Sequence, residues 1–367
     1  RSRRQRQMCI RDRKYSGFDK LIDFQKKLQS LIIDIQQKNI EKKDDVVIFF
    51  IDSLRAMDVF HRDMNGCYKA DMLEKYIDNG VVFTNVKSTG VTTYESMVSV
   101  IKKKYPYEVN VYEKNIMANF NEFELLPIAK NMDYDINFYV TEGYQIINSC
   151  PDINFVKQVY LTSKLWKLTT DMACNNKKTF NFIYIPYELH FPLICGYHSQ
   201  EPKVSGFVDV GILDTKNFVP RQLEECKSYV DRQFSYYENW FSKEILFTIF
   251  SDHSQVVFDE QEQKPYFMYY NNPDRCVNVT FLIRGFGVRQ QWNEDLVSLY
   301  DFTDIMKGLI QQKELVVPER NIAIYQYYKI HYKKLREYAK EHGVSDYIDG
   351  MQCFISKKYL YMVTPSG

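Results

Sequence analysis

The chain has 367 residues, of which 45% are hydrophobic and 26% charged, as is usual for a globular protein. Its net charge is +1, but residues 1–14 hold seven Arg or Lys and one Asp, so residues 15–367 carry a net charge of −5. This balance argues against a basic surface for nucleic acid. No apolar stretch approaches the ~20 residues of a membrane span.

Residues 1–14 look like translated vector or adaptor sequence and lack the apolar core of a signal peptide, so we exclude this leader from the fold. An anchor or signal further upstream stays open. The eight cysteines contain no C-x-x-C pair, which argues against a zinc ribbon or a disulfide framework and favours reduced thiols in the cytoplasm. The 29 Tyr and 25 Phe are typical of core residues, although aromatic walls also suit ring-bearing ligands.

Helical and strand patterns alternate along the chain. Apolar residues at helical spacing predict a helix over residues 15–43, and the unbroken run VVIFFI at 46–51 predicts a strand that is covered on both faces. The further predicted elements are a helix near 69–77, a strand at 81–86, a helix at 94–104, strands at 136–140 and 180–185, a long helix at 221–241, strands at 245–250 and 277–284, and a helix at 294–311. After residue 321 the spacing changes to strand, helix, strand.

This alternation predicts an α/β fold with a doubly wound mixed sheet flanked by helices. We expect four parts: the leader at 1–14, an N-terminal helix at 15–44, a catalytic α/β domain at 45–315, and a C-terminal α+β subdomain at 316–367 that is incomplete.

Two of the buried strands end in acids. The first strand runs directly into Asp52, and the strand at 245–250 is followed by Ser251, Asp252 and His253. Asp52 alone is equally well explained as a helix N-cap. Two carboxylates and an imidazole together favour a divalent metal ion, which can activate a weak hydroxyl nucleophile from the loop that contains Thr93.

Several segments in the right order resemble the sulfatase branch of the alkaline phosphatase superfamily. IDSLR at 51–55 resembles the first metal-binding strand of that family, and DNGVVFTNV at 78–86 its second strand. TTYESMVSVIKKKYP at 92–106 is similar to the nucleophile segment, and FSDHS at 250–254 to the SDHG motif. NVTFLIRGFGV, EDLVSLYDFTDIMKGL and ISKKYLYMV follow in family order. The resemblance covers roughly residues 45–365 and implies an alkaline-phosphatase-like fold.

The resemblance assigns the site residues. Asp52, Asp252 and His253 would be metal ligands, together with the nucleophile. In the family the nucleophile stands thirteen residues before the Pro of Tyr-Pro, which is Pro106 here, and this selects Thr93.

Two further residues follow from the same comparison. Thr92 is the neighbouring candidate for the nucleophile. His190, in YELHFP, resembles the His-x-Pro segment, in which the histidine meets the transferred group or a second metal; a structural histidine beneath a loop is the alternative.

The departures from the family pattern narrow the chemistry. A sulfatase has Cys or Ser within C-x-P-x-R for conversion to formylglycine, but here Thr93 is followed by Glu95 and Met97 at the Pro and Arg positions. Threonine cannot form that aldehyde. Ser53 replaces the second Asp of the sulfatase DD pair. The resulting set resembles the threonine-dependent phosphatases, phosphodiesterases and phosphotransferases, and its imidazole fits zinc or manganese better than calcium.

We therefore expect a metal-dependent hydrolase or transferase that acts on phosphate mono- or diesters of small molecules or glycans through Thr93 and a covalent phospho-enzyme. His190 would steady the transferred group or protonate the leaving oxygen. A sulfuric ester hydrolase and a catalytically inactive binding protein of the same fold are the alternatives. No nucleic acid partner is expected.

Overall fold

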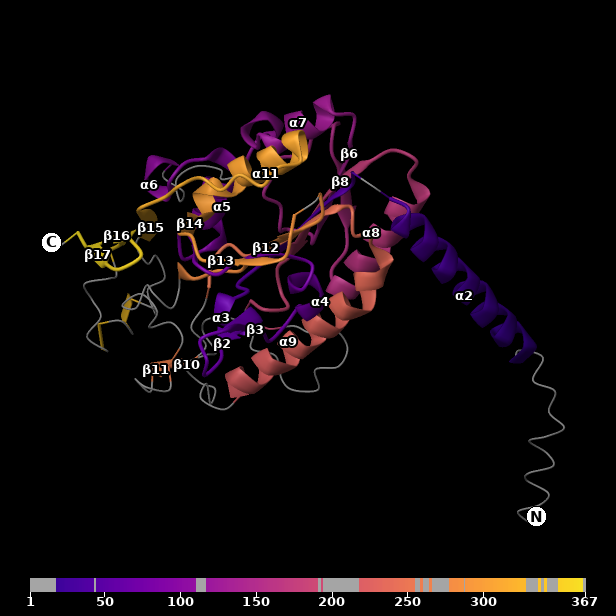
Figure 1. Cartoon of the computed structure of the whole chain (residues 1–367), viewed down its shortest axis with the longest axis horizontal. Helices are drawn as coiled ribbons and strands as arrows, with labels where there is room; N and C mark the ends of the chain where they lie inside the picture. The colour runs from indigo at the N-terminus through magenta and orange to yellow at the C-terminus, as the bar shows by residue number, and fades with distance from the viewer. Residues whose placement is uncertain are drawn as a thin grey trace, which may run out of the picture.

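A mixed sheet of eight strands forms the centre of the molecule. The structure is a computed structural model and describes residues 18–42, 44–109, 117–190, 193, 218–254, 258–259, 264–265, 277–286, 288–327, 336–337, 340–341 and 349–365. From one edge to the other, the strands are β13 (Gln291–Asn293), β4 (Gly80–Phe83), β12 (Phe281–Arg284), β9 (Leu246–Phe250), β1 (Val46–Ile51), β8 (Thr179–Ile185), β6 (Asp135–Val140) and β7 (Asn154–Lys157). Helices lie on both faces of this sheet (Figure 1), which confirms the predicted α/β fold.

Five neighbouring strands, from β9 through β1, β8 and β6 to β7, run parallel. β12 is antiparallel to both of its neighbours, and β13 is parallel to β4. In the middle of the parallel part, Phe50 of β1 stands opposite Tyr184 of β8 on one side and Phe250 of β9 on the other. The carboxyl ends of these three strands therefore meet at one edge of the sheet, the edge at which open α/β sheets bind ligands.

β1 is buried on both faces, as its unbroken apolar run predicts. Side chains alternate along the strand, so Val47, Phe49 and Ile51 pack into the core on one face and the other three residues into the core on the opposite face. The ring of Phe50 stacks on Tyr184 and on Phe250, with centroid distances of 4.4 and 5.2 Å. This packing fixes the register of the three strands that carry the candidate site.

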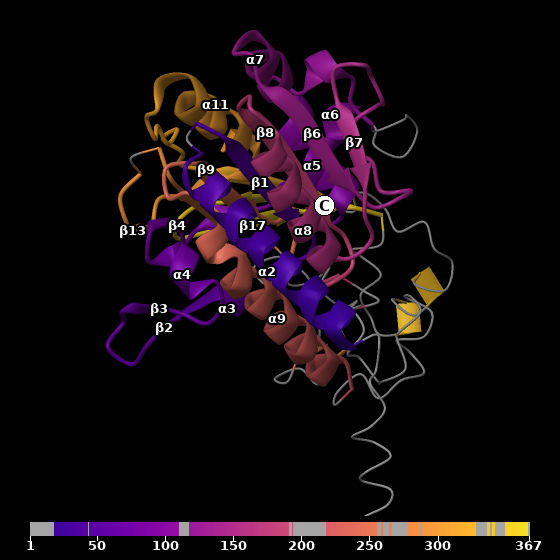
Figure 2. The same cartoon turned by 90° about the vertical axis from the view of Figure 1, so that its right-hand side faces the viewer.

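The helices form two layers (Figures 1 and 2). On one face lie α2 (Phe18–Ile40), α4 (Glu74–Ile77), α8 (Leu161–Cys174) and α9 (Phe218–Tyr237), and on the other lie α5 (Thr93–Lys102), α7 (Leu125–Asn131) and α11 (Phe302–Gln312). The predicted N-terminal, nucleophile-segment and long tyrosine-rich helices correspond to α2, α5 and α9. No prediction covers α7 or α8.

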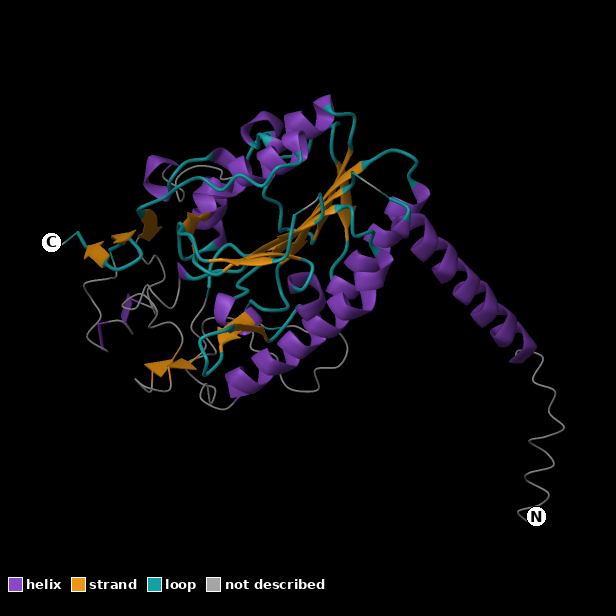
Figure 3. Ribbon diagram, viewed as in Figure 1, coloured by secondary structure: helices purple, strands orange, loops and turns teal. Residues whose placement is uncertain are grey.

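A small antiparallel sheet at the C-terminal end stands apart from the central sheet (Figure 3). It consists of β15 (Ala323–Tyr327), β16 (Met351–Ile355) and β17 (Leu360–Val363). The backbone N–H of Gln326 donates to the carbonyl oxygen of Thr89 at 2.9 Å, so β15 contacts the loop that leads into α5. The predicted C-terminal layer is thus confirmed. The helix expected between its strands falls largely outside the described residues.

The predicted helix at 69–77 forms only in its second half, as α4. Its first half is β3 (Tyr68–Ala70), which pairs antiparallel with β2 (Phe60–Arg62). The ring of Tyr68 stacks on Trp292, with centroids 5.0 Å apart. This contact, with a residue far away in the sequence, outweighs the local helical spacing.

The helix predicted at 294–311 begins later than expected. Its first residues form β14 (Val297–Ser298), which pairs with β5 (Val86–Lys87). The hydroxyl of Ser298 then accepts a hydrogen bond from the backbone N–H of Tyr300 at 3.3 Å, and α11 follows from Phe302.

The predicted division of the chain stays a prediction. The leader at 1–14 lies outside the described residues, and the expected N-terminal helix at 15–44 corresponds in position to α2. Among the helices that the structure describes, none combines the length and the apolarity needed to cross a bilayer.

Asp45, directly before β1, has a buried carboxyl group whose titration can be tested. It is fully buried, and its Oδ1 accepts hydrogen bonds from the backbone N–H and the hydroxyl of Thr179 at 2.5 and 2.8 Å. Burial raises the pKa of this carboxyl, although the bonds from Thr179 and the charge of Lys42 oppose the shift. The folded protein therefore holds this proton to higher pH than the unfolded chain, and the free energy of unfolding falls as pH rises through that window.

An Asp45→Asn variant does not titrate at this position. Its melting temperature minus that of the wild type should therefore increase as pH rises from about 4 to about 7. Thermal melts across this range measure the difference, with Asp133→Asn, a change at an exposed aspartate, as the control. A difference for Asp45→Asn that stays flat or shrinks with pH would contradict the assignment.

Candidate active site

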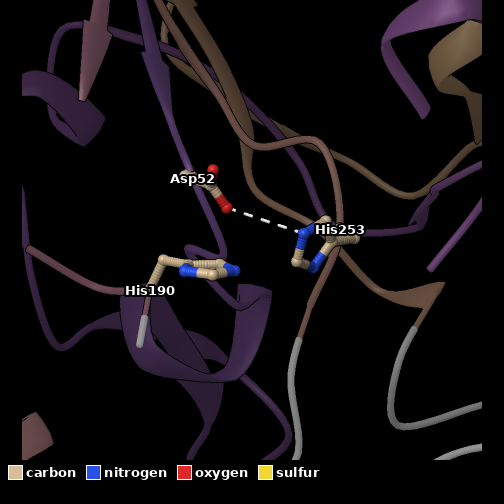
Figure 4. A group of neighbouring side chains, drawn as sticks. All are labelled: Asp52, His190 and His253. Carbon is tan, nitrogen blue, oxygen red and sulfur yellow. Dashed lines mark ion pairs between the residues drawn. The ribbon is translucent and has the colours of Figure 1, made fainter. Parts of the chain in front are cut away.

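Three adjacent parallel strands deliver the candidate residues to one edge of the sheet. Asp52 follows β1, Asp252 and His253 follow β9 with one serine between, and His190 lies on the loop after β8. Figure 4 shows the side chains of Asp52, His190 and His253 directed toward one another. The strand order 9-1-8 thus explains why residues about 200 positions apart in the sequence meet.

The polar atoms of this cluster lie close together. Nε2 of His253 is 3.5 Å from Oδ1 of Asp52 and 3.5 Å from Oδ2 of Asp252. The ligand atoms of Asp52, His190 and His253 all lie within 4.8 Å of one another, and the two imidazole rings are 5.9 Å apart at an interplanar angle of 75°. Asp52, Asp252 and His253 are at most 5% exposed, while His190 is partly exposed.

Burial shifts the pKa values of two charged groups in this cluster. It raises the pKa of Asp252 to about 6, and the charge of Asp52 adds to the shift while His253 opposes it. Burial alone would lower the pKa of His253, but the two carboxylates more than offset this and raise it. Two buried carboxylates side by side favour a nearby positive charge.

The residues fit a divalent cation. Oδ2 of Asp252 is buried and has no hydrogen-bond partner among the residues that the structure describes. Its other oxygen accepts a hydrogen bond from the backbone N–H of Ser53 at 3.2 Å. A carboxylate oxygen left in this way beside a second carboxylate and an imidazole matches the mixed oxygen and nitrogen donor set of zinc or manganese sites.

Ser53 has a positioning role that the sequence does not reveal, because the comparison with sulfatases shows only that Ser53 replaces their second Asp. Its backbone adopts the left-handed conformation, with φ of +61°. In this turn the N–H reaches Asp252, while the hydroxyl donates to Oδ1 of Asp52 at 3.1 Å. Ser53 therefore ties the two carboxylates together.

Thr93 is the first residue of α5, and its hydroxyl donates to Oδ2 of Asp52 at 3.2 Å. Thr92 is the N-cap, and its hydroxyl oxygen accepts a hydrogen bond from the backbone N–H of Glu95 at 3.3 Å. Of the two candidate threonines, Thr93 is thus the one whose hydroxyl contacts the cluster. The positive end of the helix dipole at this point also favours an anion such as a phosphoryl group.

Glu95, which stands where the family has proline, caps the start of α5. Its Oε2 accepts hydrogen bonds from the backbone N–H groups of Val91 and Thr92 at 3.1 and 3.2 Å, which completes a capping box. A Cβ at Gly90 would lie 2.3 Å from the Cβ of Glu95, so the loop can approach the helix this closely only with glycine. A capping box, rather than a proline, therefore stabilises the start of α5.

Tyr184 is the second residue that sequence reasoning missed. It is buried in β8, and its hydroxyl donates to Oδ2 of Asp52 at 2.8 Å, the same oxygen that Thr93 contacts. Burial and the charges of Asp52 and Asp252 raise its pKa well above the ordinary value, so it stays a hydrogen-bond donor. Only the register of β8 against β1 reveals this contact, and that register is not visible in a single sequence.

Two residues from the same segments, Arg55 and Met97, do not contribute to the cluster. Arg55 forms an ion pair with Asp58, with Nη2 and Oδ1 2.6 Å apart. Met97, at the position of the family's arginine, is buried in the core beneath α5. The described part of the site therefore has no cation at the place where a sulfatase has its arginine.

Comparisons with known proteins show the fold. No family model matches the sequence, and no curated protein matches it. Among solved structures, similar ones include phosphonate monoester hydrolases, sulfatases, a protein described as belonging to the alkaline phosphatase superfamily, and phosphoethanolamine transferase domains. These neighbours confirm the resemblance stated above: the chain has an alkaline-phosphatase-like fold.

Three examples give the extent of the similarity. A putative sulfatase from Bacteroides thetaiotaomicron has a TM-score of 0.59 at 13% identity and aligns over 89% of this chain and 84% of its own. The phosphonate monoester hydrolase of Agrobacterium radiobacter has a TM-score of 0.56 at 11% identity, over 88% and 87%. The C-terminal periplasmic domain of the phosphoethanolamine transferase EptC from Campylobacter jejuni has a TM-score of 0.50 at 12% identity, over 72% and 88%.

Some of these neighbours are periplasmic domains. The expectation of a cytoplasmic protein is not confirmed and stays a prediction. At such low identities the reaction of this chain has to be argued from its own residues.

The contact of Tyr184 with Asp52 can be tested without an enzymatic assay. Removing the hydroxyl in Tyr184→Phe leaves Asp52 with one donor fewer but keeps the ring stacked on Phe50. Loss of such an outer contact lowers metal affinity by roughly 10-fold or more. Calorimetric titration with zinc and with manganese measures this.

Tyr139→Phe is the matched control. Tyr139 is a buried tyrosine on the neighbouring strand β6, and its hydroxyl donates to Oδ2 of Asp171 in α8 at 3.1 Å. This variant should leave the metal affinity at the wild-type value. Equal affinities of Tyr184→Phe and wild type would show that Tyr184 does not orient Asp52.

Proposed function

We propose that this chain is a metal-dependent hydrolase or transferase that acts on phosphate mono- or diesters of small molecules or glycans. Thr93 is the nucleophile, His190 a second catalytic residue, and Asp52, Asp252, His253 and Thr93 the metal ligands. The observation that carries the proposal is the 3.2 Å contact between the Thr93 hydroxyl, at the start of α5, and Oδ2 of the buried Asp52. The fold of the solved neighbours, which include hydrolases and transferases, supports it.

A divalent zinc or manganese ion, held by Asp52, Asp252 and His253, would lower the pKa of the nucleophilic hydroxyl and offset negative charge on the phosphoryl oxygens. Calcium is a less suitable ion because imidazole is a poor ligand for it.

The chain's own residues supply positioning and proton transfer. Asp52 accepts the hydrogen bond of the Thr93 hydroxyl and so aims the oxygen, while the N-terminal turn of α5 presents partial positive charge to the bound phosphoryl group. As the Thr93 oxygen attacks phosphorus and forms a new O–P bond, its hydroxyl proton passes to Oδ2 of Asp52 and the bond to the leaving alcohol oxygen breaks. His190, on the partly exposed side of the cluster, gives that oxygen a proton.

A second displacement regenerates the enzyme. Water or an acceptor alcohol gives its proton to His190 and attacks the phospho-threonine. The O–P bond to Thr93 breaks, the Thr93 oxygen takes its proton back from Asp52, and the product leaves with the phosphoryl group. Water gives hydrolysis, and an alcohol gives transfer.

Sulfate ester hydrolysis is the second candidate, because a putative sulfatase is among the solved neighbours. Threonine at position 93 and methionine in place of the sulfatase arginine weigh against it. A catalytically inactive binding protein is the third, since the nucleophile segment departs from the family pattern. The three readings differ in what a panel of 4-nitrophenyl phosphate, bis(4-nitrophenyl) phosphate and 4-nitrophenyl sulfate would show, each with zinc, manganese or calcium.

We expect turnover of a phosphate ester with zinc or manganese. On the best substrate, Thr93→Ala should lower kcat by at least about 10³-fold, because no other hydroxyl of the loop contacts Asp52 among the described residues. Metal titration of the variant should still give binding, since three ligands remain.

Thr92→Ala is the matched control. It removes the N-cap of α5, which costs about 1 kcal/mol of stability, but it keeps the contact between Thr93 and Asp52. Retained turnover in Thr93→Ala, together with loss in Thr92→Ala, would place the nucleophile at Thr92. Turnover only of the sulfate ester would favour the second candidate, and metal binding without any turnover the third.

A further inference from the structure

Two tyrosines stand in contact on loops that follow neighbouring parallel strands, β6 and β8. Tyr187 lies three residues before His190, and Tyr144 lies in the tight turn after β6. Their rings meet edge to face, with centroids 5.2 Å apart and an interplanar angle of 77°. Tyr144 is 40% exposed and Tyr187 is partly exposed, so the pair presents aromatic surface to solvent.

A single residue connects this pair to the candidate active site. The ring of Tyr144 packs edge to face against Tyr184, with centroids 6.2 Å apart. The hydroxyl of Tyr184 in turn donates to the Asp52 oxygen that Thr93 also contacts. Two side chains, Tyr184 and Asp52, therefore connect the ring of Tyr144 with the nucleophile, on the β6 side of the site.

Buried polar contacts hold the pair in place. The side-chain ammonium of Lys164, which is fully buried in α8, donates to the hydroxyl of Thr141 at 2.8 Å and to the carbonyl oxygen of Tyr184 at 2.5 Å. The backbone carbonyl oxygen of Thr141 accepts a hydrogen bond from the backbone N–H of Tyr144 at 3.0 Å, which closes the turn. The ring positions are thus set before any ligand arrives, which lowers the entropic cost of binding.

The loop of Tyr187 is fixed in a similar way. Next to it, Oε1 of the buried Glu188 accepts a hydrogen bond from the backbone N–H of Leu161 at 2.8 Å. Burial and a hydrogen bond with Tyr144 raise the pKa of Tyr187 to about 12, so its hydroxyl stays protonated at neutral pH.

We infer that Tyr144 and Tyr187 form the subsite that binds a ring carried by the substrate's phosphoryl group, as in an aryl or sugar ester. This rests on the proposed function, because it assigns part of the substrate to the same site. Rigid aromatic side chains can bind a ring through ring–ring contact alone, without a specific polar contact. The pair therefore sets the preference for ring-bearing over small ester groups.

The test compares phenylphosphonate with methylphosphonate, which share the phosphoryl group and differ by the ring. Calorimetry on the metal-loaded protein gives the dissociation constant of methylphosphonate divided by that of phenylphosphonate, without requiring turnover. Wild type should bind phenylphosphonate more tightly, and Tyr144→Ala or Tyr187→Ala should reduce the ratio about three- to tenfold. Tyr144→Phe keeps the ring and should keep the ratio.

Two controls separate this subsite from other aromatic surface. Tyr359 is 77% exposed, and Tyr359→Ala should leave the ratio at the wild-type value. Tyr68 lines a separate open pocket of about 450 Å³ beside the β2–β3 hairpin. A ratio that falls in Tyr68→Ala but not in Tyr144→Ala or Tyr187→Ala would overturn the inference and place the ring in that pocket.

The outcomes distinguish this inference from the proposed function. An unchanged ratio in both alanine variants overturns the subsite even if phosphate esters are turned over. Phenylphosphonate binding that depends on the two tyrosines, in a protein without turnover, supports the subsite and contradicts the proposed reaction. Binding of neither phosphonate to wild type overturns both.

Discussion

Two buried carboxylates held side by side are the constraint on which the site depends. Asp52 and Asp252 meet because β1 and β9 are adjacent and parallel, with Phe50 opposite Phe250, each two residues before its acid. In a low-dielectric environment, two neighbouring negative charges destabilise the fold unless positive charge or hydrogen-bond donors offset them. His253, the backbone N–H of Ser53 and the hydroxyls of Tyr184 and Thr93 supply part of that compensation.

The remaining imbalance gives the site its chemistry. The buried Oδ2 of Asp252 lacks a hydrogen bond from any described residue, and a divalent cation would supply the missing positive charge. The same cation would act on the hydroxyl that already contacts Asp52. The cation that the buried charges require and the cation of the proposed reaction would therefore be the same one. The sheet core behind the cluster, with the stacked rings of Phe50, Tyr184 and Phe250, holds its residues in place.

The parts that depend on local pattern could be predicted from the sequence. The unbroken apolar run VVIFFI predicts β1, and the mostly apolar run ILFTIF predicts β9, because strands covered on both faces need mostly apolar side chains. The acids stand just after these runs. Contacts across strands could not be predicted. Tyr184 reaches Asp52 only through the register of β8, and Ser53 reaches Asp252 only through a left-handed turn. The hairpin at Tyr68 was likewise mistaken for a helix because its packing against Trp292 is not local.

The departures from the sulfatase pattern also acquire a physical meaning. Glu95 closes a capping box at the start of α5, and Met97 packs in the core below it. Both fit a helix whose first turn presents a threonine hydroxyl rather than an oxidised cysteine. Tyr144 and Tyr187 extend the same edge of the sheet with an aromatic surface, so that nucleophile, charge and ring recognition would lie on loops after adjacent strands.

Anomalous diffraction from crystals soaked with zinc or manganese tests the central claim most directly. The account predicts a peak bonded to carboxylate oxygens of Asp52 and Asp252 and to an imidazole nitrogen of His253, at about 2.0–2.2 Å for zinc. It also predicts the Thr93 hydroxyl at the edge of that site. A fully loaded crystal in which the metal binds elsewhere, with these side chains free of it, would contradict the account.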